Sequence, residues 1–131
     1  MTDNFFTDAD LISVYTRAQA LEDGALVDVS ELAREAGFTF PTAITAALHA
    51  RLTPSEQDKK YGQDYTGRLW DVLWMAKLAA RRTENDRVRV QVIIAEVKRG
   101  KLLHPVVELW AVCSPGDIAE PVITIGFLED F

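Results

Sequence analysis

The sequence has a single cysteine, Cys113, so it cannot form an internal disulfide or a cysteine-rich zinc site. It has only two histidines, His49 and His104, and neither lies in a metal-ligand spacing such as HExxH. The glycine-rich patterns GxGxxG and GxxxxGK, which cradle phosphate groups, are also absent. The sequence therefore predicts no metal site, no cofactor and no recognisable catalytic group.

Long apolar runs are missing as well. No segment approaches the roughly eighteen apolar residues of a membrane-spanning helix, and the N-terminal MTDNFFTDAD has acids where a signal peptide carries Lys or Arg. We therefore expect a cytoplasmic protein that does not contact a membrane. The length of 131 residues, with 48% hydrophobic and 26% charged residues, is typical of one globular domain over residues 1–131.

The charge of the chain is unevenly distributed. The net charge is −6, with 11 acids and 5 bases up to Thr66 but 9 of each from Gly67 onward. An acidic chain is repelled by phosphate backbones and complements a basic protein surface. The region from residue 81 to 101 is an exception, with seven bases and three acids, which we interpret first as a solvated strand face and turn. As an alternative, its bases are nucleic-acid contacts: Arg81, Arg82, Arg87, Arg89, Lys98, Arg99 and Lys101.

Capping signals divide the first half of the chain into short helices. Thr16 and Gln19 match a reciprocal capping box for a helix that Gly24 ends, and Thr7 with Asp10 is the alternative start. An extended stretch over residues 25–29 follows. Three further elements are expected: a helix over Glu31–Ala36 between Ser30 and Gly37, a helix from Pro41 to Leu52, and a polar turn that Thr53 and Glu56 open and Gly62 closes.

Residues 67–82, GRLWDVLWMAKLAARR, form the most informative segment. At 100° per residue one helical stripe is apolar and is expected to face the core: Leu69, Val72, Leu73, Ala76, Ala79 and Ala80. A second face carries Trp70 and Trp74 beside Lys77 and Arg81. Large aromatic residues in small domains usually pack internally, but Trp and Arg are also enriched at protein interfaces. Both interpretations stay open from the sequence.

The second half of the chain is strand-like. Alternating apolar residues predict a half-buried strand over residues 88–94, a nearly continuous apolar run predicts a central strand over 106–112, and a third strand covers 121–127. Pro115 and Gly116 fit the central positions of a type II turn. We therefore predict an α+β fold with N-terminal helices packed on a C-terminal three-stranded antiparallel meander. The predicted core joins the helical stripe to these residues: Ile44, Leu48, Val88, Val90, Val92, Leu109, Ala111 and Ile123.

The order of several segments resembles a known family. VYTRAQALEDGALVDVSELAREAGF, GRLWDVLWM, and VCSPGD followed by EPVITI are similar to small uncharacterised bacterial proteins encoded on plasmids, phages and integrative elements. The resemblance covers about Val14 to Ile125 and implies no catalytic or binding residue. It implies a genetic context in which small acidic proteins inhibit host defence, such as restriction or CRISPR systems, and this inference is by analogy.

Three functional hypotheses follow from the sequence. The leading one is a non-catalytic acidic protein-binding module, an anti-defence inhibitor in its narrower form, which uses Trp70, Trp74, Lys77 and Arg81 against a basic nucleic-acid-binding host complex. A homodimer that buries the same tryptophans is a variant of this hypothesis. The second is nucleic-acid binding through the bases of residues 81–101. The third is a small enzyme in which Cys113 acts as nucleophile with His104 as base, or in which His49 acts.

Overall fold

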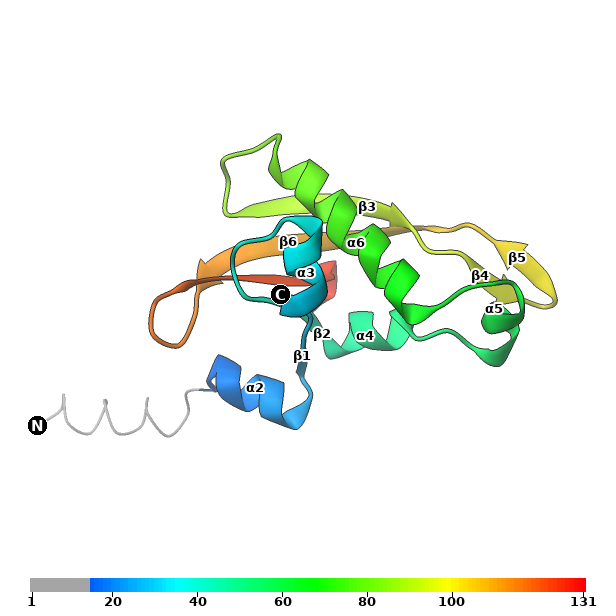
Figure 1. The fold of residues 1–131 in the computed structure, drawn as a ribbon, viewed down its shortest axis with the longest axis horizontal. Coiled ribbons are helices and arrows are strands. Elements are labelled where there is room, and N and C mark those ends of the chain that lie inside the picture. The colour runs from blue at the N-terminus through cyan, green and yellow to red at the C-terminus, as the bar shows by residue number, and fades with distance from the viewer. Residues whose placement is uncertain (1–14) are drawn as a thin grey trace, which may run out of the picture.

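A computed structural model describes residues 15–131 (Figure 1). The alternative helix start at Thr7 lies outside the described residues. Five α-helices, seven strands and one 3-10 turn lie within them. In chain order they are α2 (Arg17–Asp23), β1 (Leu26–Asp28), α3 (Ser30–Ala36), β2 (Thr42–Thr45), α4 (Ala46–Leu52), α5 (Glu56–Lys60), α6 (Tyr65–Ala80), β3 (Arg87–Ile93), β4 (Glu96–Lys98), β5 (Lys101–Leu103), β6 (Val106–Pro115), β7 (Pro121–Phe127) and η1 (Leu128–Asp130).

Five strands form one mixed sheet in the order β1-β2-β7-β6-β3. β2 runs parallel to β7, with Ile44 beside Ile125, and the other neighbours are antiparallel. β4 and β5 form a separate hairpin. The α+β class is confirmed, but the simple C-terminal meander is wrong. First, the β4–β5 hairpin lies between β3 and β6 in the chain. Second, β1 and β2 extend the sheet beyond β7, because β2 pairs with β7, which follows it by about eighty residues in the sequence.

Side-chain caps set the starts of α2, α4, α5 and α6, although not always at the predicted residue, whereas α3 has no side-chain cap. Thr16 caps α2 as predicted, because its Oγ1 accepts from the Gln19 N–H at 3.0 Å and Gln19 Oε1 accepts from the Thr16 N–H at 2.9 Å. The expected cap at Ser30 is wrong. Ser30 is the first residue of α3, and its hydroxyl instead donates to Asp28 Oδ1 at 2.6 Å and accepts from the Thr42 N–H at 2.9 Å.

The helix predicted from Pro41 starts five residues later than expected. Residues Thr42–Thr45 form β2, all four are buried, and Thr45 then caps α4 by accepting from the Leu48 N–H at 3.3 Å. Strand pairing with both β1 and β7 satisfies the backbone of this segment, so tertiary pairing overrides the helical pattern. Ile44 is buried as predicted, but on a strand.

Two further local predictions are corrected. Ser55, not Thr53, caps α5, with Asp58 completing the reciprocal pair. The turn after β6 is not centred on Pro115 and Gly116, because Pro115 still pairs with Pro121 in the ladder. The turn lies over residues 116–120, and its left-handed residue is Ala119 with φ 68°.

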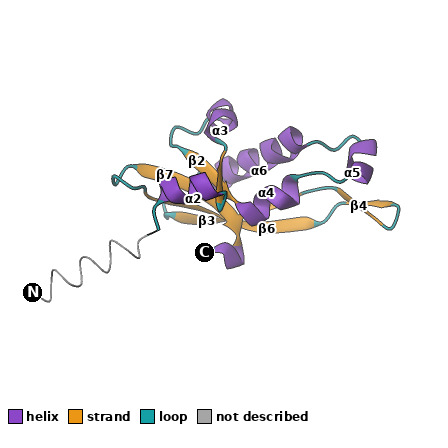
Figure 2. Cartoon of the chain, turned by 90° about the horizontal axis from the view of Figure 1, so that it is seen from below, coloured by secondary structure: helices purple, strands orange, loops and turns teal. Residues whose placement is uncertain are grey.

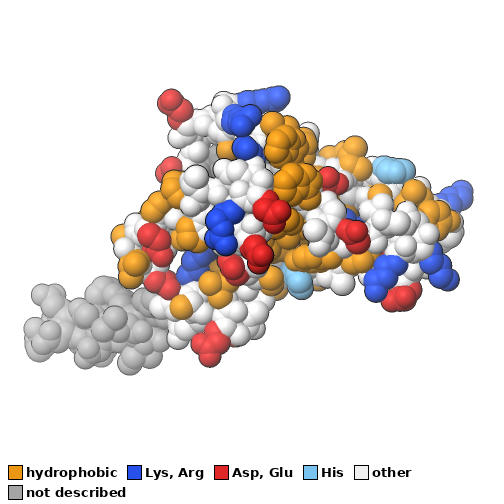
Figure 3. Space-filling model, in the orientation of Figure 1, with side chains coloured by type: hydrophobic (Ala, Val, Ile, Leu, Met, Phe, Trp, Pro, Cys, Tyr) orange, Lys and Arg blue, Asp and Glu red, His pale blue; other side chains and the backbone are white. Residues whose placement is uncertain are grey.

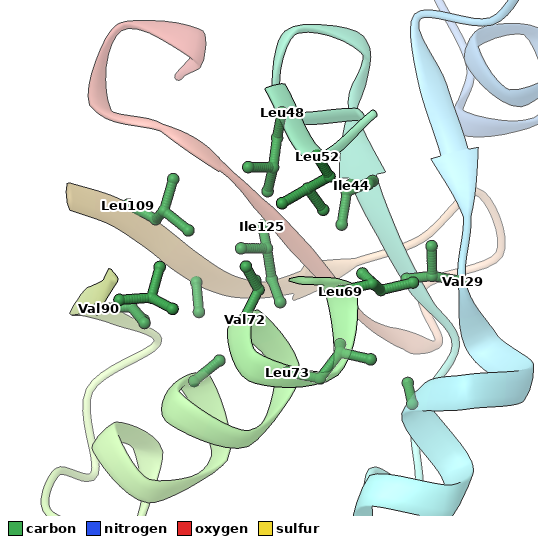
Figure 4. Packing of buried hydrophobic residues seen from close by; sticks show 14 of the residues in the cluster. Val29, Ile44, Leu48, Leu52, Leu69, Val72, Leu73, Val90, Leu109 and Ile125 are labelled. Atoms are coloured by element: carbon green, nitrogen blue, oxygen red, sulfur yellow. The ribbon is translucent and has the colours of Figure 1, made fainter. Parts of the chain in front are cut away.

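The core lies between the sheet and α6. Figure 4 shows Val72 pointing from α6 toward Ile125, while Leu69 lies beside Val29 and Leu73 points toward the side on which α3 lies. α3 and α6 lie on the same side of the sheet (Figure 2). The predicted helical stripe is confirmed at four positions, since Leu69, Val72, Leu73 and Ala76 are at most 4% exposed. At the end of α6 the prediction is only partly right, because Ala79 is half-buried and Ala80 is exposed. Val88 and Ile123 are only half-buried and pack against this core.

Candidate functional site

Two stacked tryptophans lie on the outer side of α6. The ring centroids of Trp70 and Trp74 are 6.0 Å apart and their planes differ by 14°. Trp70 is half-buried and packs against the core, whereas Trp74 is 41% exposed. Lys77 Nζ lies 5.3 Å from the Trp74 ring centroid, within cation–π range. We call Trp70, Trp74 and Lys77 the aromatic face, and Figure 3 shows hydrophobic side chains gathered over α6 at this position.

Arg81, the fourth predicted partner-binding residue, is separate from this cluster. It is exposed at the C-terminal end of α6, where its backbone N–H bonds to the Lys77 carbonyl at 3.2 Å. It lies about two helical turns beyond Trp74. The structure therefore brings the two tryptophans and Lys77 together, and Arg81 extends the same side of the helix toward its end.

An apolar groove adjoins the aromatic face. It has a volume of about 420 Å³ and lies between α6 and the sheet, lined by Asp71, Trp74, Met75, Gln91, Val92, Ile93 and Val106. Four of its large apolar side chains are exposed: Trp74 by 41%, Met75 by 39%, Ile93 by 55% and Val106 by 58%. Burial raises the pKa of Asp71, the acid on its rim. Clustered exposed apolar side chains of this kind mark binding surfaces more often than isolated ones do.

The sequence interpretation missed this groove. One signal was available, because Ile93 is apolar at a position where the alternating pattern of β3 requires a solvent-facing residue. The approach of Met75 and Trp74 to Ile93 and Val106 depends on how α6 crosses the sheet, which the helical period alone does not specify.

The seven bases between residues 81 and 101 do not form one surface. Arg81 and Arg82 follow α6, and Lys98, Arg99 and Lys101 lie in the β4–β5 hairpin at the other end of the molecule (Figure 1). Arg87 and Arg89 lie on β3, with their guanidinium carbons 4.7 and 5.2 Å from the ring centroid of Trp110. The structure thus divides the proposed nucleic-acid contacts into separate groups.

A buried ion pair, Arg68 with Asp58, lies near the other end of α6. Arg68 Nη2 is 3.1 Å from Asp58 Oδ2 and donates to the Ala95 carbonyl at 2.6 Å, while Nη1 donates to the Leu52 carbonyl at 3.3 Å. Burial opposes the charge of Asp58, but the backbone N–H groups of Ser55 and Val97, together with Arg68, hold its pKa at about 2. These bonds tie α5, α6 and the start of the hairpin together, so we interpret the pair as structural.

His49 lies beside a hollow of about 400 Å³ whose lining includes Asp28, Glu31 and Glu35. Its Nδ1 is 2.7 Å from the hydroxyl of Tyr65, and burial raises the pKa of that tyrosine. Residues 15–131 provide no hydrogen-bond partner that orients the second ring nitrogen. The arrangement therefore lacks the oriented base and adjacent nucleophile of a covalent catalytic site.

The proposed Cys113 and His104 pair is not assembled. His104 is exposed just before β6, and Cys113 lies near the far end of the same strand, opposite Ile123. Nine residues of extended chain separate them by about 30 Å. Cys113 is only partly accessible and faces its neighbours in the sheet. The predicted nucleophile and base therefore cannot act on the same substrate atom.

The described part of the chain, residues 15–131, has no group of three or more His, Cys, Asp or Glu side chains that could hold a metal ion. No helix in that part has the length and apolar character needed to cross a membrane.

The fold and surface described so far define an α+β protein with a mixed five-stranded sheet and an aromatic helix face. The chain belongs to a family of unknown function, DUF6573, whose model matches residues 1–131. No curated protein and no solved structure matched the chain in the corresponding comparisons.

Proposed function

We propose that this protein is a non-catalytic protein-binding module whose partner contacts the aromatic face. The main support is the exposure of Trp74, which is 41% accessible although it stacks on Trp70 and lies under Lys77. A stacked and partly ordered indole offers a large contact area with little further loss of side-chain freedom on binding. Such a tryptophan is a typical anchor of a protein interface.

The distribution of charge favours a protein partner over a nucleic acid. A nucleic-acid site needs cations that follow one phosphate backbone, but the bases of residues 81–101 lie at opposite ends of the molecule. The net charge of −6 adds general repulsion. Catalysis is less well supported, because Cys113 and His104 are far apart and His49 has only Tyr65 at hydrogen-bond distance.

The narrower form of the proposal is an inhibitor of a host defence system, of the anti-restriction or anti-CRISPR kind. It is supported by the resemblance to proteins of plasmids, phages and integrative elements, and by the acidic first half of the chain, with 11 acids and 5 bases up to Thr66. That charge complements a basic nucleic-acid-binding complex. In this form the protein acts in the cytoplasm.

Affinity capture from a lysate of the source organism, followed by mass spectrometry, tests the general proposal. Wild-type protein and Trp74→Ala serve as baits, and Tyr61→Ala is the matched control because Tyr61 is an exposed aromatic residue, by 51%, outside the aromatic face. We expect a protein that wild type and Tyr61→Ala retain and Trp74→Ala loses. Binding of that protein is then measured with purified components.

A partner retained equally by all three baits would contradict the use of the aromatic face. A second copy of this chain is the other candidate partner, because a two-fold symmetric homodimer would bury the aromatic face of both copies. Sedimentation at several concentrations separates the cases: a dimer that Trp74→Ala dissociates assigns the face to a second copy.

A further inference from the structure

β3 has an open hydrogen-bonding edge. In its antiparallel pairing with β6, the Cys113 N–H bonds to the Asp86 carbonyl at 2.7 Å, and the Ile94 N–H bonds to the Pro105 carbonyl at 3.2 Å. Alternate residues bond to the same neighbour, so the even-numbered residues of β3 face β6. The backbone groups of the odd-numbered residues face outward: Arg87, Arg89, Gln91 and Ile93. Within residues 15–131 no strand pairs with that edge.

The apolar groove lies along this edge: Trp74, Met75 and Val92 line it on the α6 side, and Ile93 and Val106 continue it around the edge onto the opposite face. Met75 and Trp74 form its helical wall, and Val92 of β3 faces the same side. A strand added next to β3 would alternate its side chains between two environments. Those on the α6 side would enter an apolar groove, so large apolar residues fit there.

The other side of the same edge is basic. The side chains of Arg87 and Arg89 project away from α6, as the alternating burial of β3 requires. Among the described residues Arg87 has no ion pair, and Arg89 has only a long one to Glu108 at 3.9 Å. Opposite charges directly across neighbouring strands are stabilising. Acidic residues are therefore the matching choice on this side of an added strand.

We propose that the β3 edge binds an extended segment of the protein partner in which large apolar residues alternate with acidic ones. The backbone of the segment pairs with the outward N–H and C=O groups of β3, its apolar side chains fill the groove, and its carboxylates meet Arg87 and Arg89. The proposal rests on the proposed function and adds the binding mode. The charge at this edge is opposite to that of the whole chain, so the docking segment is acidic even where the rest of the partner is basic.

A second copy of this chain is a poorer occupant of the same edge. Two antiparallel β3 strands in register would place Arg87 opposite Ile93, and Arg89 opposite Gln91, with no carboxylate across from either arginine. Four arginines would then share one side of the joint sheet. Like charges close together on neighbouring strands are destabilising.

Two labelled, capped heptapeptides serve as probes, one alternating valine with glutamate and one alternating valine with lysine. Binding is measured by fluorescence anisotropy on the full chain at low salt. We expect the glutamate peptide to bind about tenfold more tightly, because two cross-strand pairs change from attractive to repulsive. It should also slow amide exchange at Arg89, Gln91 and Ile93, whose N–H groups gain partners. Equal affinity for the two peptides, or no protection of these amides, would overturn the proposal.

Gln91→Pro tests the backbone pairing. Proline removes the outward N–H of residue 91 without removing a bond to β6, and proline is tolerated at edge strands. Gln91→Ala is the matched control, since it loses the same side chain and keeps the N–H. We expect Gln91→Pro to lose binding of the glutamate peptide and Gln91→Ala to retain it. Equal behaviour of the two variants would contradict strand addition.

Arg89→Glu provides a test that does not depend on the proline variant folding. Arg89 is exposed, and reversal of its charge should weaken the glutamate peptide and strengthen the lysine peptide, each by several-fold. No change in preference would overturn the charge assignment. Single-stranded oligothymidine that bound through Arg89 in place of both peptides would assign these arginines to nucleic acid instead, and a dimer that Gln91→Pro dissociates would assign the edge to a second copy.

The captured partner separates this proposal from the general function. If Trp74→Ala loses the partner and Gln91→Pro keeps it, the protein-binding function stands and strand addition is wrong. If Gln91→Pro loses the partner and Trp74→Ala keeps it, the edge binds its segment and the aromatic face is not the partner anchor.

Discussion

Arg68 and Asp58 form an ion pair in which the two side chains are only 3% and 9% exposed, with Nη2 and Oδ2 3.1 Å apart. Each charge has further partners, since Arg68 donates to three backbone carbonyls and both Asp58 oxygens accept from backbone N–H groups. Arg68 Nε, by contrast, is buried without a hydrogen-bond partner among the described residues. The pair therefore stabilises mainly by keeping two buried charges compensated.

Removal of one partner of this pair should be more harmful than removal of both. Asp58→Ala leaves an uncompensated buried guanidinium, and we expect a loss of about 3–5 kcal/mol in the free energy of unfolding. The double variant Asp58→Ala with Arg68→Met should recover part of that loss, because no buried charge remains. Urea unfolding of the two single variants and the double variant gives the coupling free energy. Strictly additive losses would show that the two charges do not depend on each other.

The same pair predicts an acid-sensitive stability. The pKa of Asp58 is about 2 in the folded protein, below the ordinary value of 3.8. Because this pKa is lowered on folding, the contribution of ionised Asp58 to the free energy of unfolding is complete above about pH 4 and is lost as the pH falls toward 2. The contribution is on the order of 2 kcal/mol. Between pH 5 and 2 the free energy of unfolding should therefore fall less in Asp58→Asn than in wild type. An equal fall in the two proteins would contradict the prediction.

The core prediction rests on Leu73 of α6, which is fully buried in the core cluster. Leu73→Ala should lower the free energy of unfolding by about 2–5 kcal/mol, because it removes buried apolar surface and leaves a cavity. Ile118→Ala is the control, since Ile118 is 84% exposed in the turn after β6 and should change stability by less than about 0.5 kcal/mol. A similar effect of both changes in urea unfolding would show that burial does not account for the Leu73 result.

Gly37 connects a helix end to the aromatic face. It ends α3 with φ 105°, and a Cβ at this position would overlap the end of the Lys77 side chain. Gly24 ends α2 with φ 86° and has open space around it, so it is a matched control. Both alanine variants should lose about 1–2 kcal/mol from backbone strain. Only Gly37→Ala should also displace Lys77 from Trp74, observed as a change in tryptophan fluorescence that Gly24→Ala does not share.

Local signals in the sequence predicted the elements whose stabilising contacts are local or periodic. The Thr16 box and the α6 stripe with Leu73 depend on neighbours three or four residues away, and both are confirmed. The helix predicted over Thr42–Thr45 was wrong for the opposite reason. The strand conformation of this segment depends on β7, about eighty residues later, and a helix-like spacing of Ile44 and Leu48 cannot report that partner.

The candidate site was predicted in part for the same reason. Trp70, Trp74 and Lys77 lie on one helix, so their proximity follows from the helical period. The groove was not predictable in this way, because it joins Met75 to Ile93 and Val106 across three elements. The bases of residues 81–101 were grouped by sequence distance, but three of them lie in the β4–β5 hairpin, at the other end of the molecule from Arg81 and Arg82.

The two tryptophans should respond differently to truncation, because one supports the core and the other presents its ring to solvent. Trp70 packs against the core cluster, so Trp70→Ala should cost roughly 2 kcal/mol of stability, less than a fully buried tryptophan. Trp74 is 41% exposed, so Trp74→Ala should change the melting temperature little while it removes partner binding. A double-mutant cycle with Lys77→Ala measures the cation–π contact, which we expect to contribute about 0.5–1 kcal/mol at this exposure. If Trp74→Ala instead destabilised the monomer as strongly as Trp70→Ala, its ring would be part of the core, and the aromatic face would have to be rejected as the partner site.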